Sequence, residues 1–382
     1  MSAPPSQTRS AVQWLREELF DGPFNALLTI AIGTLLAWAV PRLVGWALLH
    51  AVFRPDAAAC HAAEGAGACW GVIVAKLRAI VFGRYPFELQ WRPALGMALL
   101  MTMLGVSAVP ACWKRALLPA WLVALALFVV LMAGGVAGLS PVSTSRWGGL
   151  PLTLLLSIAS LAAAFPLGVL LALGRRSGWP IVRLLCATCI EMVRGVPLIS
   201  VLFMASFMLP LLLPTGWQID VLLRVLIALV VFTAAYLAEV VRGGLQAVPE
   251  GQRLAARALG LGPWQVQRNV VLPQALRATV PALVNSFIGS FKDSSLVVIV
   301  SLYELTGALT VALGGDPTWR PFYLEGYLFI AAVYWAFCFT MSRYSRWVEV
   351  RLRDADGSER AARRWAPHHA LQSTDRARSP VT

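Results

Sequence analysis

The chain of 382 residues is too apolar for a soluble protein, because hydrophobic residues make up 58% of it and charged residues only 13%, whereas soluble domains carry about 25% charged residues. Its mean hydropathy is +0.69. The formal net charge of +13 suggests an anionic partner, but the basic residues are dispersed over short loops and the C-terminal tail. In a membrane protein this pattern indicates orientation and contact with anionic lipid, so we exclude nucleic acid as a partner.

Apolar runs of roughly 17 to 25 residues recur along the chain, and each could cross a hydrocarbon core of about 30 Å as a helix. We therefore predict an all-α, polytopic membrane protein with about eight transmembrane helices. The first run continues through Pro41 and Arg42 without a small-residue cleavage site, so we interpret it as a retained helix and not as a cleaved signal. The predicted spans are near residues 24–48, 94–110, 117–134, 149–173, 194–213, 221–241, 277–300 and 325–346.

Composition divides the chain into three parts. Residues 1–140 are expected to form an extension of three helices with a long periplasmic loop at 54–93, and residues 141–348 a five-helix core. The basic segment 349–382 is expected to be a disordered cytoplasmic tail. Most short basic segments fall on one side of the membrane if both termini are cytoplasmic.

The long loop contains Cys60 and Cys69 in the stretch CHAAEGAGAC. Two cysteines that close a short Gly/Ala-rich loop in an oxidising periplasm can form a disulfide. The alternative is two free thiols.

The stretch from Ala255 to Pro273 is polar and basic although its surroundings are apolar. A short helix fits EGQRLAARAL because Ala and Leu are strong helix formers. Gly260 then suits a left-handed C-terminal cap, and Pro263 suits the first turn of a second helix. Two short helices held at a fixed angle would suit docking into a groove on a soluble partner, and the alternative is a solvated loop.

The same stretch resembles the signature loop of bacterial binding-protein-dependent importers, which reads E-A-A, three residues, G, nine residues, I-x-L-P. Ala255, Ala256, Gly260, Leu272 and Pro273 match that spacing, whereas Leu254 stands where the family has Glu. The resemblance implies that the loop at 243–273 docks into an ATP-hydrolysing subunit. The docking residues are then Leu254, Ala255, Ala256, Arg257, Leu259, Gly260, Leu272 and Pro273.

Three further motifs, AEVVRGGLQAVPEGQ, EMVRGVPLISVLFM and FKDSSLVVIVSLYEL, resemble the polar-amino-acid permeases of the histidine, glutamine and general L-amino acid importers. The segment FGRYPFELQWRP resembles the M-type permease of the general L-amino acid system. The resemblance implies an inner-membrane permease core that works with two ABC ATPase subunits, a periplasmic amino-acid-binding protein and a second, related permease. No cofactor is then bound by this chain, because ATP and Mg²⁺ would be hydrolysed by the partner ATPase.

Charged residues at the ends of two spans are candidates for the substrate path. Glu191 and Arg194 share a helical face just before Gly195 and Pro197, which should break the helix. They form either a gate or an interfacial ion pair, since ionisable groups at membrane depth are costly unless functional or paired.

Lys292 and Asp293 lie within the seventh span and point about 100° apart on a helix. They form either contacts between helices or contacts with a zwitterionic amino acid. The hydroxyl of Ser294 should return a hydrogen bond to the backbone.

No enzymatic site is expected. The lysines Lys76, Lys114 and Lys292 do not follow a glycine, so the chain lacks a phosphate-binding GxxxxGK[ST] loop and is not the ATPase. No His spacing suggests a metal site. The alternatives are a permease for another small solute such as a peptide or nitrate, an ion-coupled secondary transporter, which would show repeats with midplane charges, or a membrane scaffold.

Overall fold

A computed structural model describes residues 18–214 and 216–365, with side chains described up to residue 351. Every secondary-structure element of three or more residues in this part of the chain is a helix, in agreement with the predicted all-α class. Five helices are long and apolar enough to cross a membrane, and a sixth span results if α8 and the helix that follows it are taken together. The five are Pro23–Leu49, Gly149–Arg175, Val221–Ala247, Pro263–Val300 and Arg320–Arg351.

The predicted spans at 94–110 and 117–134 correspond to shorter helices, of 18 and 17 residues. The predicted span at 194–213 omits the helix that precedes the bend. A separate helix already occupies Pro180–Arg194, and the chain bends by 104° before it continues from Leu198. The reason is local: Gly195 ends the first helix, and Pro197 has an extended backbone that starts the next.

The chain divides into two compact units, and residues 78–140 fall in the second unit together with the core. The first unit joins residues 1–77 to residues 316–326. Its described helices are α2 (Pro23–Val44), the π-helical turn η1 (Gly45–Leu49), α3 (Ala57–Ala62), the beginning of α4 (Gly71–Phe82), η8 (Arg320–Phe322) and the first residues of α16 (Tyr323–Trp365).

Polar contacts join the two segments of this first unit. The Lys76 ammonium lies 2.6 Å from the Asp316 carboxylate. His61 Nε2 donates to the Thr318 carbonyl oxygen at 2.9 Å, and the buried Glu325 carboxylate accepts from the Cys69 backbone N–H. Residues about 250 positions apart in the chain are thus held together by polar contacts, and one of these contacts satisfies the buried Glu325 carboxylate.

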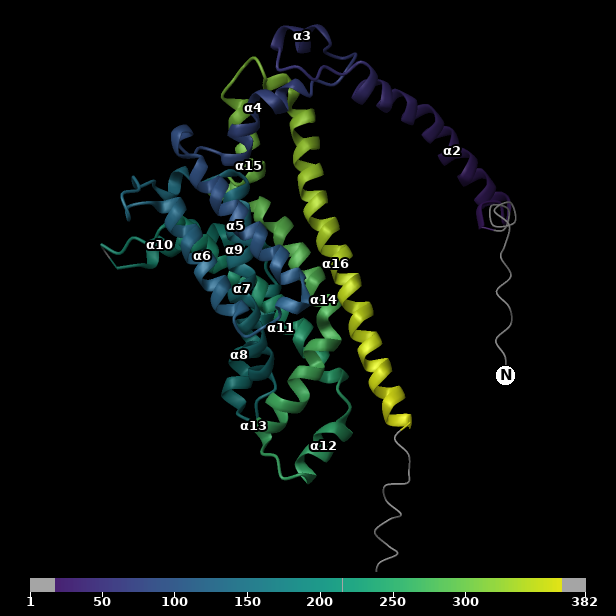
Figure 1. The fold of residues 1–382 in the computed structure, drawn as a ribbon, viewed down its shortest axis with the longest axis vertical. Coiled ribbons are helices and arrows are strands. Elements are labelled where there is room, and N and C mark those ends of the chain that lie inside the picture. Colours follow the sequence, from purple (N-terminus) through teal and green to yellow (C-terminus); the bar gives the residue numbers. More distant parts are fainter. Residues whose placement is uncertain (1–17, 215, 366–382) are drawn as a thin grey trace, which may run out of the picture. The chain divides into compact units, whose positions relative to one another are not determined.

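The second unit contains the helical bundle (Figure 1). Its elements after α4 are η2 (Phe87–Leu89), α5 (Trp91–Ala108), η3 (Pro110–Cys112), α6 (Leu117–Ala133), η4 (Thr144–Arg146), α7 (Gly149–Arg175), α8 (Pro180–Arg194), α9 (Leu198–Phe203), η5 (Met204–Met208), α10 (Leu209–Leu212), α11 (Val221–Ala247), α12 (Glu250–Ala258), α13 (Pro263–Gln265), η6 (Val266–Val271), α14 (Leu272–Asp293), η7 (Ser294–Val300), α15 (Leu305–Gly314) and α16 from Tyr327 onward.

Helix α11 is the centre of this unit and packs along both α7 and α14. Two glycines allow the close approach. A Cβ at Gly168 of α7 would meet the Leu237 side chain at 2.9 Å, and a Cβ at Gly244 of α11 would meet the Ala275 carbonyl oxygen at 2.6 Å. Small residues at helix contacts permit the tight packing that holds membrane bundles together.

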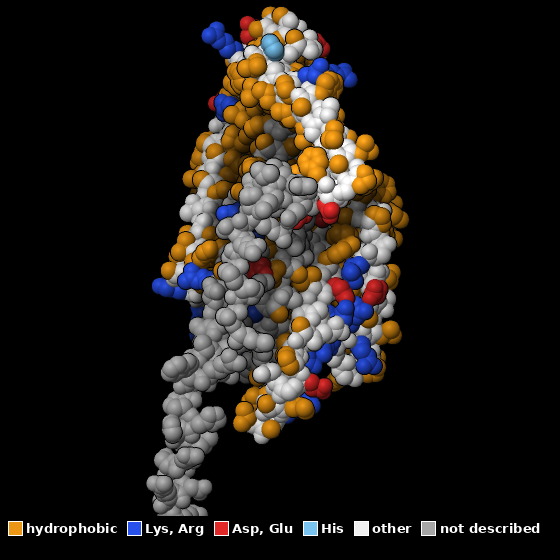
Figure 2. Space-filling model, turned by 90° about the vertical axis from the view of Figure 1, so that its right-hand side faces the viewer, with side chains coloured by type: hydrophobic (Ala, Val, Ile, Leu, Met, Phe, Trp, Pro, Cys, Tyr) orange, Lys and Arg blue, Asp and Glu red, His pale blue; other side chains and the backbone are white. Residues whose placement is uncertain are grey.

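Helices α5 and α6 pack on this core through a buried cluster that includes Tyr85, Phe128, Trp147 and Leu154. Gly96 of α5 leaves room for the Phe128 ring of α6, since a Cβ there would lie 2.7 Å from it. The side chains exposed on the face in Figure 2 are largely apolar, and Lys, Arg, Asp and Glu gather in the lower right of that view. A broad apolar surface is expected for a protein in contact with lipid.

The C-terminal segment differs from the expectation of a disordered tail. Helix α16 continues to Trp365, so residues 349–365 are helical. The remainder of the predicted tail, residues 366–382, lies outside the described residues.

Candidate functional site

The predicted docking segment consists of α12, a left-handed turn and α13. Helix α12 ends at Ala258, and Gly260 has a φ of +80°. Pro263 then occupies the first turn of α13, and the Gly262 N–H donates to the Gln265 side chain at 2.9 Å. The two short helices and the glycine cap agree with the prediction from the sequence.

One side of this docking segment is fixed to the bundle. Ala256 is buried and packs in the same cluster as Leu245, Val266 and Val271. Arg253 donates to the Leu245 carbonyl oxygen at 2.9 Å. The segment therefore cannot rotate freely against α11 and α14.

The opposite side of the docking segment is exposed. Leu254 is 57% exposed, Leu259 82% and Trp264 63%, and Ala255 and Arg257 are also exposed. Leu272 and Pro273 lie further along, at the beginning of α14. Large apolar side chains on a rigid, polar segment form the kind of surface that a soluble partner covers.

A cluster of ion pairs lies where α7, α8 and α11 end. The Glu239 carboxylate is paired with Arg242 on the same helix and lies 3.3 Å from Arg175 and 3.9 Å from Arg194. Arg175 also lies 2.7 Å from Glu191. Glu191 and Arg194, for which the sequence left open either a gate or an interfacial ion pair, thus each take a partner on a different helix.

Arg176 lies next to this cluster, just beyond the end of α7. Burial lowers its pKa, and the positive charges of Arg253 and Arg242 lower it further. The region between α7, α11 and α12 therefore carries more positive than negative charge.

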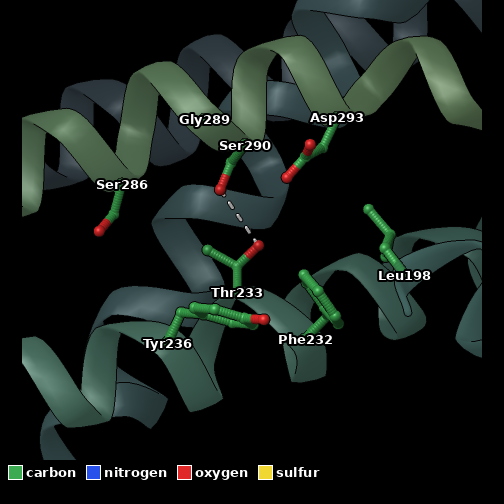
Figure 3. A pocket seen from close by; sticks show the side chains of 8 residues that line it. All are labelled: Leu198, Phe232, Thr233, Tyr236, Ser286, Gly289, Ser290 and Asp293. Atoms are coloured by element: carbon green, nitrogen blue, oxygen red, sulfur yellow. Dashed lines mark hydrogen bonds between the residues drawn. The ribbon is translucent and has the colours of Figure 1, made fainter. Parts of the chain in front are cut away.

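A cavity of about 330 Å³ lies between α11 and α14 near the bend that follows α8 (Figure 3). This volume is at the lower end of the range of ligand pockets, roughly 300–1000 Å³. The residues that line it are Leu198, Phe232, Thr233, Tyr236, Ser286, Gly289, Ser290 and Asp293.

The α14 side of the cavity is polar. Ser286, Ser290 and Asp293 point toward α11 in Figure 3, and the Ser290 and Thr233 hydroxyls lie 3.3 Å apart. The spacing of Ser286, Gly289, Ser290 and Asp293 is that of one helical face. This polar stripe in an apolar helix was the available sequence signal for the cavity, although we predicted only Asp293 from it.

The remaining predicted path residues divide between the cavity and its surroundings. Lys292 is exposed and does not line the cavity, as the 100° step between neighbouring helical residues requires. Ser294 is buried and its hydroxyl donates to the Phe291 carbonyl oxygen at 2.7 Å, so the prediction that it bonds the backbone is confirmed. Gly195 and Pro197 form the bend before Leu198, which lines the cavity.

The first unit contains the two cysteines of the predicted disulfide. The structure joins Cys60 to Cys69 in a disulfide with their Cα atoms 5.3 Å apart, and both residues are fully buried. Among the described residues no group of His, Cys, Asp and Glu could hold a metal ion.

Comparison with known proteins gives one family. The profile of the family described as "Binding-protein-dependent transport system inner membrane component" matches residues 164–354. The inner membrane amino-acid ABC transporter permease protein YhdY of Escherichia coli is 47% identical over 350 residues, which are 89% of this chain and 93% of that protein.

A second relative also covers almost the whole chain. The glutamate/glutamine/aspartate/asparagine transport system permease protein BztC of Rhodobacter capsulatus is 35% identical over 92% of this chain and 95% of its own length. Among solved structures, one described as an amino acid ABC transporter with histidines is 33% identical over 53% of this chain and 92% of its own, with a TM-score of 0.48.

Proposed function

Because this chain belongs to the inner-membrane permeases of binding-protein-dependent amino-acid ABC importers, we propose that the cavity between α11 and α14 is its substrate path. A permease of this kind is the transport component and has no ATPase domain of its own. It works with an ATPase and a binding protein. The observation that carries the proposal is the polar stripe Ser286, Ser290 and Asp293 facing Thr233 and Tyr236 across the cavity.

The chemistry of the lining suits an amino acid. Asp293 supplies a carboxylate for the α-ammonium group, and charge-assisted hydrogen bonds of this type are roughly twice as strong as neutral ones. The hydroxyl groups of Ser286, Ser290 and Thr233 supply donors and acceptors, while Phe232 and Leu198 supply apolar surface. Polar groups placed beside apolar surface are typical of sites that orient small ligands.

The substrate class follows from the relatives. BztC is described as a permease for glutamate, glutamine, aspartate and asparagine. We propose that this chain serves amino acids with acidic or amide side chains. Both relatives that cover almost the whole chain are amino-acid permeases, which argues against the alternative of a peptide or nitrate importer.

The loop at 243–273, which contains the docking segment, is proposed to couple transport to ATP hydrolysis. Ala256 and Arg253 fasten α12 to the bundle, whereas the exposed Leu259 and Trp264 are free to enter a groove on the ATPase. ATP and Mg²⁺ are bound by that subunit and not by this chain. Since the segment is rigid, closure of two ATPase subunits would move α11 and α14 together with it and bias the bundle between two states.

We further propose that the permease pairs with a second, related permease subunit and that both termini are cytoplasmic. The resemblance of the segment FGRYPFELQWRP to an M-type permease supports the pairing. Basic residues at the ends of α7, α8 and α11 support a cytoplasmic position for the docking segment, in line with the positive-inside rule.

Uptake into proteoliposomes that contain the permease, its ATPase and the binding protein tests the proposed function. We expect Asp293→Asn to lower uptake at least tenfold, whereas Glu88→Gln, which removes an exposed carboxylate that does not line the cavity, should retain most of it. Uptake that continues with a hydrolysis-deficient ATPase would instead support an ion-coupled transporter. Normal uptake by Asp293→Asn would refute the role of the cavity.

A further inference from the structure

Arg194 connects the ion-pair cluster to the cavity. It is the last residue of α8, immediately before the bend at Gly195. Its guanidinium carbon lies over the Tyr236 ring, 5.5 Å from the ring centroid, and Tyr236 lines the cavity. The guanidinium group therefore lies directly beyond one wall of the cavity, separated from it by a single aromatic ring.

Arg194 is also the most weakly held arginine of the cluster. Arg175 lies 2.7 Å from Glu191 and 3.3 Å from Glu239, and Arg242 makes two hydrogen bonds to Glu239. Arg194 approaches Glu239 only to 3.9 Å, which is beyond hydrogen-bond distance. Its Nε is buried and has no hydrogen-bond partner in the part of the chain that the structure describes.

The position of Arg194 along the bundle is distinct from that of Asp293. Helices α11 and α14 both run between the docking segment and the opposite end of the bundle, in opposite directions. Tyr236 and Ser286 therefore lie nearer to α12, and Asp293 lies farther from it (Figure 1 and Figure 3). An amino acid that moves from Asp293 toward the docking segment approaches Tyr236 and then Arg194.

We propose that Arg194 forms a second, inner subsite that binds the α-carboxylate of the transported amino acid. A guanidinium group binds a carboxylate through two parallel N–H···O bonds, and this geometry distinguishes it from a lysine ammonium. Its side chain is one-third exposed, so a ligand can reach it once Tyr236 turns aside. Glu239 holds the guanidinium group loosely when the subsite is empty, and the substrate carboxylate replaces that contact.

This inference rests on the proposed function and adds to it a particular carboxylate-binding residue. The test uses the permease–ATPase complex in lipid nanodiscs without the binding protein, so that the permease alone selects the ligand. Binding of L-glutamine is compared with binding of L-glutaminamide, which keeps the α-ammonium group and the side chain but lacks the α-carboxylate.

The wild-type complex should bind glutamine more tightly than the amide. Arg194→Gln should weaken glutamine binding about tenfold and leave amide binding nearly unchanged, because one charge-assisted contact is lost. Arg194→Lys should give an intermediate ratio, and it decides the question if the Gln variant does not assemble. Arg183→Gln, an exposed arginine on the same helix, is the matched control and should change neither affinity.

Two other results are decisive. The Arg194 variants could keep the wild-type ratio of glutamine affinity to amide affinity, whatever their basal ATP hydrolysis. Arg194 would then be only part of the ion-pair cluster. That result would overturn the inference and leave the proposed function intact. A different result would remove both proposals. If the wild-type complex bound neither probe and the Asp293→Asn variant showed normal uptake, the proposed function would fail, and the inner subsite would fail with it.

Discussion

Glu191 and Arg175 form an ion pair of 2.7 Å between α8 and α7, although Arg194 lies one turn from Glu191 on the same helix. Arg175 also approaches Glu239 of α11 at 3.3 Å. One arginine thus joins three helices at the end of the bundle that carries the docking segment. Two carboxylates, Glu191 and Glu239, hold the ends of these helices in register.

Glu239→Gln should destabilise the bundle more than Glu191→Gln. Glu239 faces Arg175, Arg194 and Arg242, so its neutralisation leaves these arginines without their shared carboxylate. Breaking a buried ion pair costs about 3–5 kcal/mol, and the partial exposure of this group reduces the expected loss to roughly 1–3 kcal/mol. Thermal unfolding of the purified variants in detergent measures the difference.

The Glu191 side chain is 59% exposed and pairs with Arg175, whereas that of Glu239 is 24% exposed and faces three arginines. An equal loss of stability in both variants would contradict a central role for Glu239.

Gly260→Val should abolish ATPase binding while the chain still inserts into the membrane. The backbone at Gly260 has a φ of +80° with open space around a Cβ, so the cost is backbone strain and not a clash. For a residue with a Cβ this conformation costs about 1–2 kcal/mol, and a β-branched residue tolerates it least. Co-purification with the ATPase is the measurement.

Gly251→Ala on α12 provides the matched control for that experiment. Gly251 lies inside the helix, and nothing lies within 4 Å of a Cβ there, so alanine should be neutral or favourable for the helix. If Gly260→Val bound the ATPase as well as Gly251→Ala did, the left-handed turn would not be needed for docking.

Leu254→Glu should be tolerated, whereas Ala256→Glu should disrupt the docking segment. Leu254 is 57% exposed and Ala256 only 4%, so a carboxylate remains in water at the first position and enters the apolar cluster at the second. The Leu254 variant also restores the Glu of the family signature. ATPase affinity and uptake should therefore be retained or improved in Leu254→Glu, and both should be lost in Ala256→Glu. Loss of docking in Leu254→Glu would show that the apolar side chain itself fills the ATPase groove.

The first unit should lose stability in acid through Asp316. The hydrogen bond and charge of Lys76 hold the pKa of this carboxyl below its ordinary value. A carboxyl whose pKa is lower in the folded state stabilises that state above its unfolded pKa of about 3.9, and the contribution disappears as the pH falls through the folded pKa. Protease resistance of the region around residue 316, measured from pH 6 down to pH 3, should therefore decline in the acid range.

In Asp316→Asn the protease resistance of this region should no longer fall between pH 6 and pH 3. Its protease resistance at pH 6 should equal that of Lys76→Met. If both variants declined between pH 6 and pH 3 as the wild type does, another group would be responsible.

The disulfide of the first unit can be tested chemically. Cys60 and Cys69 are fully buried and joined, so neither should react with an alkylating reagent in the denatured protein until a reductant is added. The free cysteines Cys112 and Cys186 serve as internal controls, since they should react without reductant. Alkylation of Cys60 and Cys69 in the unreduced protein would show that the thiols are free when the protein is made.

Local features of this protein could be predicted from its sequence because they depend on neighbouring residues. Apolar runs identified most of the long helices but not α8, Gly260 and Pro263 identified the turn between α12 and α13, and Gly195 with Pro197 identified the break after α8. These features follow from helix length, capping and backbone sterics, which depend on residues that are close together in the sequence.

Only the tertiary structure decided which distant residues meet. It paired Glu191 with Arg175, brought Thr233 of α11 opposite Ser290 of α14, and joined His61 to Thr318 in the first unit. Periodicity shows which side of a helix is polar but not which helix faces it, because that choice depends on packing at small residues such as Gly168 and Gly244. The sequence by itself therefore determined most of the long helices and the docking segment, whereas the cavity and the arginine at its inner end came from how α8, α11 and α14 pack.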